Sequence, residues 1–183
     1  MTPSKNKGFT LLETLIAFVV LTVGLLGAVA LQAQAKQASY DSLQRAAALN
    51  LANDVIGRIA ANDTAAAMAL YNTEIHFATP EDINNSTACL NSPCTDIALA
   101  NFDIQQWLRA IKANEGTGTL SRASICITPT IDQDQVNLNV TISWVGRQNV
   151  KQSTANTKIT CGSDESNRKI VSINSFIFMR PVS

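Results

Sequence analysis

An uninterrupted apolar run constrains this chain more than any other feature. From Leu11 to Leu31, 21 residues carry a single charge, that of Glu13. At about 1.5 Å of rise per residue, a helix of this length crosses a hydrocarbon layer about 30 Å thick. The run follows a basic leader that ends at Gly8. We therefore expect a membrane span with a short polar segment before it.

The order of leader and apolar run differs from that of an ordinary secretory signal. A secretory leader has an apolar segment of about 7 to 15 residues followed by a cleavage site with small residues. Here the apolar residues come after Gly8, so a cut at Gly8 would leave them in the mature protein. Glu13 has two interpretations, because an ionised acid costs up to about 3 kcal/mol at the centre of a span. It either pairs with a cation or reaches the water at the headgroups.

The residues around this junction carry a resemblance. Lys7 to Leu15, KGFTLLETL, resembles the class III leader and amino terminus of type IV pilins and type II secretion pseudopilins. In that family a membrane prepilin peptidase cuts after the glycine and methylates the new terminal amine. The resemblance implies cleavage between Gly8 and Phe9, N-methylation of Phe9, and a mature chain of 183 − 8 = 175 residues. It also implies that Glu13 pairs with the terminal amine of a neighbouring subunit.

A second group of residues, between Gly24 and Asn62, resembles the PilV-type minor pilins. The matching residues are Gly24-Leu25-Leu26-Gly27, Leu31-Gln32, Arg45-Ala46 and the run from Leu51 to Asn62. Unlike many major pilins, the chain has no proline between Pro3 and Pro80, and a helix without proline lacks the usual cause of a kink. The resemblance implies a minor pilin that helps to initiate type IV pilus assembly and supports twitching motility and surface adhesion.

The resemblance also implies partners and a location. The partners would be the prepilin peptidase/N-methyltransferase, other minor pilins, the major pilin, a tip adhesin and the inner-membrane assembly platform. Lys5 and Lys7 precede the span and favour a cytoplasmic amino end, which would place the C-terminal domain in the periplasm. The protein would be a single-pass protein of the bacterial inner membrane that later joins the pilus, or fimbrium, at the cell surface.

The helical pattern continues beyond the span. Apolar residues recur every four positions and form one stripe at Leu43, Ala47, Leu51, Val55 and Ile59. Asp54 lies four residues before Arg58, the favourable order for a helical ion pair. We expect one helix from Phe9 to about Asn62. We also expect four regions: the leader (1–8), the transmembrane half of the N-terminal helix (9–31), its periplasmic half (32–62), and a globular periplasmic αβ-loop and β-sheet region (63–183).

The last region predicts an α+β fold. Between residues 63 and 101 the periodicity fades, with a possible helix start at 79–81 and a loop at 84–86. Residues 102–113 predict a short amphipathic helix, in which Trp107 fits a core anchor better than a ligand platform. Apolar and polar residues alternate from Val136 to Trp144, and we expect further strands at 124–131, 157–161 and 170–179. A type IV pilin-like fold results: a long N-terminal helix packed on a four-stranded antiparallel β-meander.

The four cysteines are Cys89, Cys94, Cys126 and Cys161, an even number in a segment expected outside the cytoplasm, where disulfides persist. Three pairings are possible. We favour Cys89 with Cys94, which flank a turn, and Cys126 with Cys161, which would join two predicted strands; the closures are worth about 2 and about 4 kcal/mol. A zinc site at Cys89 and Cys94 is a weaker alternative, because the one histidine, His76, lies elsewhere.

Composition and motifs narrow the function further. The net charge is zero and no block of like charges occurs, which argues against a general nucleic-acid surface. No nucleophile elbow, phosphate-binding glycine loop or histidine cluster is present, so we expect no enzyme activity, cofactor or metal. Asp132 and Asp134 fit a solvated turn better than a calcium loop. A minor pseudopilin of type II secretion is the nearest alternative to a minor pilin, followed by a DNA-uptake pilin and a membrane-anchored periplasmic enzyme.

Overall fold

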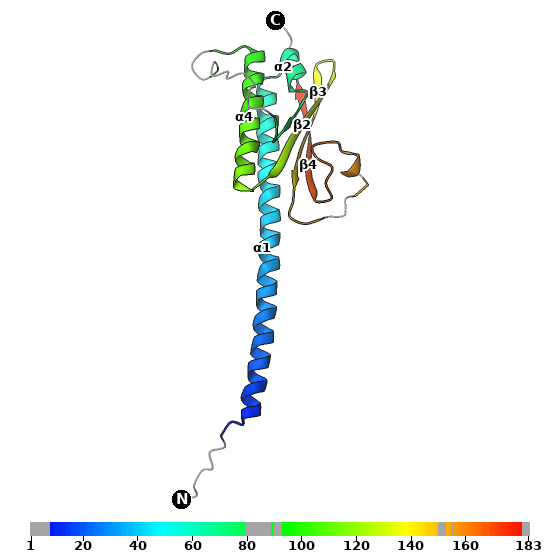
Figure 1. The fold of residues 1–183 in the computed structure, drawn as a ribbon. Coiled ribbons are helices and arrows are strands. Elements are labelled where there is room, and N and C mark those ends of the chain that lie inside the picture. Colours follow the sequence, from blue (N-terminus) through cyan, green and yellow to red (C-terminus); the bar gives the residue numbers. More distant parts are fainter. Residues whose placement is uncertain (1–7, 80–88, 90–92, 150–152, 155, 181–183) are drawn as a thin grey trace, which may run out of the picture. The chain divides into compact units, whose positions relative to one another are not determined.

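The computed structural model describes residues 8–79, 89, 93–149, 153–154 and 156–180. The chain comprises two compact units, Met1–Ser42 and Leu43–Ser183. Helix α1 (Leu11–Ala61) is continuous and contributes its first part to one unit and its second part to the other (Figure 1). Its bounds lie within two residues of those expected, so the prediction of one long N-terminal helix is confirmed.

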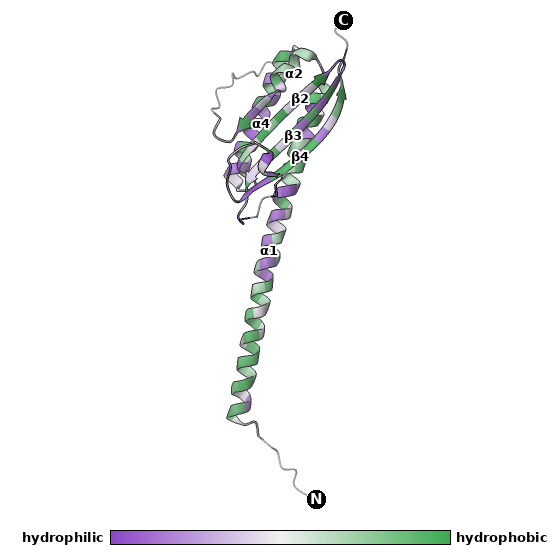
Figure 2. Ribbon diagram, turned by 90° about the vertical axis from the view of Figure 1, so that its right-hand side faces the viewer, coloured by the Kyte–Doolittle hydropathy of each residue, from purple (hydrophilic) through white to green (hydrophobic). Residues whose placement is uncertain are grey.

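The described part of the first unit is residues 8–42, and it consists almost entirely of α1. Its large apolar side chains are exposed; Phe18 and Leu26, for example, are 68% and 69% exposed. Figure 2 shows the first half of α1 as hydrophobic on its visible face, with hydrophilic residues more frequent further along the helix. A helix that is apolar all round needs either a protein core or a membrane. By its length and composition α1 could cross a membrane.

The second unit contains a four-stranded antiparallel sheet in the order β1-β2-β3-β4. Its strands are β1 (Thr73–His76), β2 (Ser121–Asp132), β3 (Gln135–Val145) and β4 (Arg168–Phe178). A tight turn joins β2 to β3, with Gln133 at a φ of 55° between Asp132 and Gln135, which pair directly. This turn lies at Asp132 and Asp134, where the sequence predicted a solvated turn.

Helix α4 (Asp96–Thr117) and the second part of α1 cover one face of this sheet (Figure 1), and α2 (Ala65–Tyr71) packs beside α4. The apolar residues of the β3 alternation, Val136, Leu138, Val140, Ile142 and Trp144, are all buried in the core. They meet Leu51, Val55 and Ile59 of the predicted α1 stripe and the adjacent Ala48 and Ala52. Leu43, at the start of the predicted stripe, is instead 59% exposed. Burying both apolar surfaces against each other is the layering expected of an α+β fold, and the predicted fold class is confirmed.

One of the four predicted strands is wrong. Residues 157–161 form no strand. Residues 157 and 158 belong to a single 3-10 turn, η1 (Asn156–Lys158), and residues 159–161 have no regular secondary structure. The physical reason is that the buried Arg168 guanidinium binds the carbonyl oxygens of this segment, which therefore do not pair with a strand. The fourth strand is instead β1, whose four residues include one buried side chain, that of Ile75, and so show no period in the sequence.

The helices between α1 and β2 also differ from the prediction. Helix α4 begins at Asp96 and not near Phe102, because the Thr95 side chain caps it by accepting a hydrogen bond from Ala98 N–H. It ends at Gly118, which adopts the left-handed conformation typical of helix C-termini. The short helix α2 was not predicted. Trp107 is 1% exposed, which confirms it as a core residue. The expected helix start at 79–81 and loop at 84–86 lie almost wholly outside the described residues.

Candidate processing and assembly site

The Gly8–Phe9 bond lies before α1, in a segment without regular structure. Both residues are exposed, Phe9 to 84%, and a Cβ added at Gly8 would meet no atom within 4 Å. The described chain therefore imposes no packing requirement for glycine at this position. Any preference for glycine has to come from a molecule that binds this segment.

Glu13 lies in the first turn of α1 and closes a hydrogen-bonded ring with Thr10. The Glu13 N–H donates to Thr10 Oγ1 over 3.2 Å, and the Thr10 N–H donates to Glu13 Oε2 over 3.3 Å. The pair forms a capping box, which satisfies two backbone donors left free at a helix start. This role was not predicted, although the spacing Thr10-Leu11-Leu12-Glu13 is the known signature of such a box.

The same carboxylate has no cationic partner within the described part of the chain. Its hydrogen bonds there are with Thr10, and the large side chains nearest to it along the helix, Leu11, Leu12, Leu15 and Ile16, are apolar and exposed. The carboxylate is thus held in a defined position at the end of an apolar helix while its charge is left without compensation. This arrangement can accept a cation supplied by another molecule.

The structure joins Cys89 to Cys94 and Cys126 to Cys161, with Cα–Cα distances of 5.3 and 5.9 Å. These are the two pairings favoured from the sequence. The second bridge ties β2 to the segment after η1, and not to a further strand as expected. Glu74 lies near both sulfurs of this bridge. Disulfide sulfurs are not thiolates, so these three residues do not form the ligand set that zinc requires.

A partly buried polar cluster joins α1, α2 and α4, and we call it the helix cluster: Asp54, Arg58, Asn62, Tyr71, Asp103 and Trp107. The Tyr71 hydroxyl donates to Asp103 Oδ2 over 2.7 Å and accepts a hydrogen bond from Asn62 Nδ2 over 3.1 Å. Arg58 pairs with Asp103 at 3.2 Å and with Asp54 at 3.0 Å, which confirms the helical ion pair. Asp54 also accepts a hydrogen bond from the Trp107 indole.

The helix cluster shifts two pKa values. Burial, together with the hydrogen bond to Asp103, raises the pKa of the Tyr71 phenol well above its usual range. Burial alone would lower the pKa of the Arg58 guanidinium, but its hydrogen bonds and charge interactions with Asp54 and Asp103 outweigh this and raise it. Both shifts favour the protonation states found at neutral pH. The cluster therefore keeps Tyr71 neutral and Arg58 charged while it links the three helices.

Comparison with known families gives two adjoining matches. Residues 3–29 match the family described as the prokaryotic N-terminal methylation motif, and residues 30–105 match the family described as Type IV pilin Tt1218. No curated protein and no solved structure matches the chain. The first match contains Gly8, Phe9 and Glu13, and the second contains the part of α1 that packs on the sheet. With the observed fold, the two matches support placing the chain in the type IV pilin superfamily.

Proposed function

We propose that this protein is a minor pilin of the PilV type, made as a precursor and cut after Gly8. Phe9 then becomes the methylated amino terminus, and the apolar part of α1 anchors the subunit in the inner membrane until it enters a pilus. There it works with other minor pilins to start filament assembly, and twitching motility and surface adhesion depend on it. The family matches support a pilin role in pilus-type assembly. The pilin family is structural, and this role requires no catalytic residue in the chain.

One observation carries the proposal: an exposed Gly8–Phe9 junction is followed at once by a capped apolar helix that holds the uncompensated Glu13 carboxylate. In a membrane, a charge in this position is retained mainly where a partner exists. Cleavage at Gly8 creates a terminal amine four residues before Glu13 in every subunit. A neighbouring subunit in a filament therefore offers the cation that the described chain does not provide.

The first test is mass spectrometry of the mature protein. We expect a chain that begins at Phe9 and carries one added methyl group on its terminal amine. Gly8→Leu should leave the precursor uncut, because a bulky side chain replaces the glycine that the peptidase binds. Gly116→Leu is the matched control, since Gly116 is also exposed and a Cβ added there would meet no atom within 4 Å. A mature chain that still begins at Met1 would contradict the proposal.

The second test separates the pilus from type II secretion, because minor pseudopilins share the leader and the acid at Glu13. Deletion of the gene should abolish surface pili and twitching while exoprotein secretion continues. Complementation with the intact chain should restore pili. Loss of secretion with normal pili would instead assign the protein to the secretion system.

A further inference from the structure

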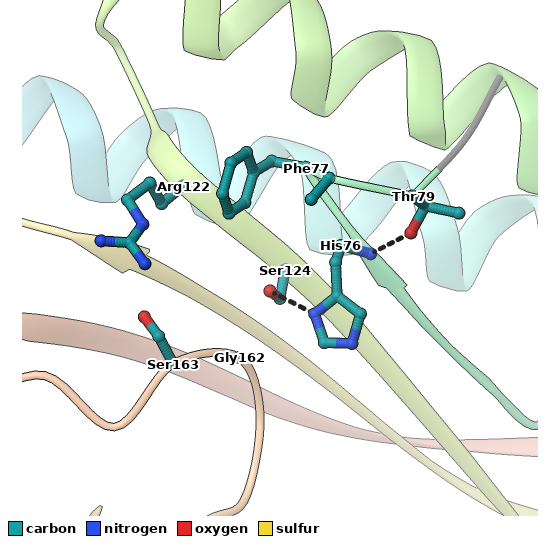
Figure 3. A pocket seen from close by; sticks show the side chains of 8 residues that line it. His76, Phe77, Thr79, Arg122, Ser124, Gly162 and Ser163 are labelled. Atoms are coloured by element: carbon teal, nitrogen blue, oxygen red, sulfur yellow. Dashed lines mark hydrogen bonds between the residues drawn. The ribbon is translucent and has the colours of Figure 1, made fainter.

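A groove of about 460 Å³ opens on the second unit, beside the end of β1. It is lined by His76, Phe77, Ala78, Thr79, Arg122, Ser124, Gly162 and Ser163, which come from β1 and its following turn, from β2, and from the segment after Cys161. We call it the β1 groove. Its volume falls in the range of about 300 to 1,000 Å³ that is usual for small-molecule sites. Figure 3 shows the Arg122 guanidinium and the Ser163 hydroxyl pointing toward one another at one side of it.

Arg122 is held in the groove by an unusual backbone conformation. Its φ is 50°, a left-handed value that a residue with a side chain rarely adopts, and it lies where the β2–β3 register shifts. The Glu115 carboxylate accepts a hydrogen bond from the Arg122 N–H and so holds this conformation. Bulges of this kind redirect side chains, and backbone strain of this kind is concentrated at functional sites.

The Arg122 side chain is also fixed by two neighbours. Its Nη1 atom pairs with Glu165 at 2.5 Å, and its guanidinium lies 5.7 Å from the centre of the Phe77 ring. A guanidinium stacked on a ring and paired through one nitrogen keeps further N–H donors in a fixed plane. Arg122 and Phe77, which both line the groove, thus present planar donors and an apolar wall together.

The charges around the groove do not favour an anion. Arg122 is paired with Glu165, and His76 Nε2 lies 3.6 Å from Glu74. A phosphate or carboxylate that approached Arg122 would also meet the Glu165 carboxylate, and one that approached the His76 ring would meet the Glu74 carboxylate; like charges at this distance repel. The groove therefore fits a ligand without net charge.

The backbone of the groove does not favour an added peptide strand. A peptide that extends a sheet is held by free main-chain groups at the sheet edge. Here the amides around the groove already donate within the chain: His76 to Thr79 Oγ1, Phe77 to Ala123 O, Thr79 to His76 O and Gly162 to Glu74 Oε1. A ligand has to be recognised mainly by side chains.

We propose that the β1 groove binds a neutral saccharide. Such a ligand carries hydroxyls that accept hydrogen bonds from a guanidinium and exchange them with a protein hydroxyl, and its C–H groups pack on an apolar ring. In the groove Arg122 supplies the guanidinium, Ser163 the hydroxyl and Phe77 the ring. Binding would give the second unit a role in contact with polysaccharide surfaces that is separate from filament assembly.

The test uses the purified full chain, labelled with nitrogen-15, in lauryldimethylamine oxide, since maltoside detergents carry sugar headgroups themselves. Lactose, cellobiose and diacetylchitobiose are titrated separately, with inorganic phosphate as an anionic probe. We expect at least one disaccharide to shift the Phe77 and Gly162 amide resonances to saturation, at an affinity insensitive to salt. Arg122→Gly should weaken disaccharide binding at least about tenfold, because hydrogen bonds to a charged group are lost.

Arg122→Gly is chosen because glycine adopts a φ of 50° without strain, so the fold is retained while the side chain is removed. Ser163→Ala is a second variant that leaves the backbone unchanged and should also weaken binding. Phe178→Ala is the matched control: Phe178 is an exposed aromatic residue outside the groove, and its loss should leave the affinity unchanged. The proposal is overturned if no disaccharide gives saturable shifts, if only phosphate binds, or if the Phe178 variant weakens binding as much as the groove variants. Failure here would leave the mass of the mature chain, and so the pilin proposal, unaffected.

Discussion

Tyr71→Phe removes one oxygen atom from the centre of the helix cluster and tests whether this cluster stabilises the second unit. Tyr71 is fully buried, and its hydroxyl links Asn62, which directly follows α1, to Asp103 of α4. The ring is kept by phenylalanine, so its packing 5.7 Å from the Trp107 ring is preserved. The variant therefore isolates the hydrogen bonds.

The magnitude follows from what the hydroxyl contacts. The hydrogen bond to the Asp103 carboxylate, 2.7 Å long, is of the kind worth about 1.5 to 3 kcal/mol. Asp103 is 3% exposed, so water replaces the lost donor poorly. Arg58 still pairs with the other carboxylate oxygen and limits the loss. We expect the free energy of unfolding to fall by about 2 kcal/mol.

Urea unfolding of the full chain in detergent, followed by tryptophan fluorescence, measures this change. Both tryptophans, Trp107 and Trp144, lie in the core of the second unit, so the signal reports on that unit. Asn174→Val is the matched control, because it removes an exposed hydrogen bond of the same 2.7 Å length and should change stability by less than about 0.5 kcal/mol. If Tyr71→Phe costs no more than this control, or shows no coupling to Asp103→Asn in a double-mutant cycle, the cluster does not stabilise the unit.

Three further predictions concern the second unit. The raised pKa of Tyr71 means that its neutral form stabilises the fold: this contribution is complete below about pH 10, where the unfolded phenol is protonated, and is lost as the pH rises further. In a Tyr40→Phe variant, tyrosinate absorbance should therefore increase only together with unfolding. Gly162→Ala should cost about 2 to 4 kcal/mol in urea unfolding, since its Cβ would lie 2.5 Å from Ser143 Oγ at a φ of +72°, whereas Gly116→Ala should be neutral or stabilising. Arg168→Met should increase amide hydrogen exchange at residues 156–162, because three carbonyl oxygens lose their donor.

The parts of the fold that could be predicted are those in which apolar residues recur at a regular spacing over many positions. Five alternating apolar residues identified β3, and the apolar stripe with one residue every four positions identified the second part of α1. Strand β1 could not be found in this way, because a four-residue strand with one buried side chain has no period. It is defined by its pairing with β2, from Thr73 opposite Ile127 to His76 opposite Ser124, and that register depends on the intervening helices.

The false strand at 157–161 shows the opposite error, in which a local pattern was overruled by a distant residue. The alternation of Thr157, Ile159 and Cys161 is typical of a strand, but Arg168 binds the Ile159 and Cys161 carbonyl oxygens. A buried arginine cannot be distinguished from a surface one in a single sequence.

The candidate site divides in the same way. Gly8, Phe9 and Glu13 are close in sequence, so their motif could be recognised without a structure. The β1 groove could not be recognised, because Phe77, Arg122 and Ser163 are brought together only by strand pairing and by the Cys126–Cys161 bridge. A site built from neighbours along the chain leaves a motif in the sequence, whereas a site built from strand register leaves none.

Glu13 combines two roles that a single substitution can separate, the capping of α1 and the supply of a negative charge. Glutamine at this position retains an oxygen that can accept the Thr10 N–H, as in capping boxes that use Gln, but it carries no charge. Alanine provides neither. If pairing with a neighbouring amine drives incorporation, Glu13→Gln and Glu13→Ala should lower the amount of protein in sheared pili equally. The loss should be at least about tenfold, because each variant leaves the neighbour's terminal amine without its carboxylate partner and a lost pairing of about 1.4 kcal/mol is already tenfold. Cleavage after Gly8 should continue in both variants, as measured by the mass of the membrane-bound chain. Recruitment of Glu13→Gln at the level of the unmodified protein would show that the helix start, and not the charge, is what assembly requires.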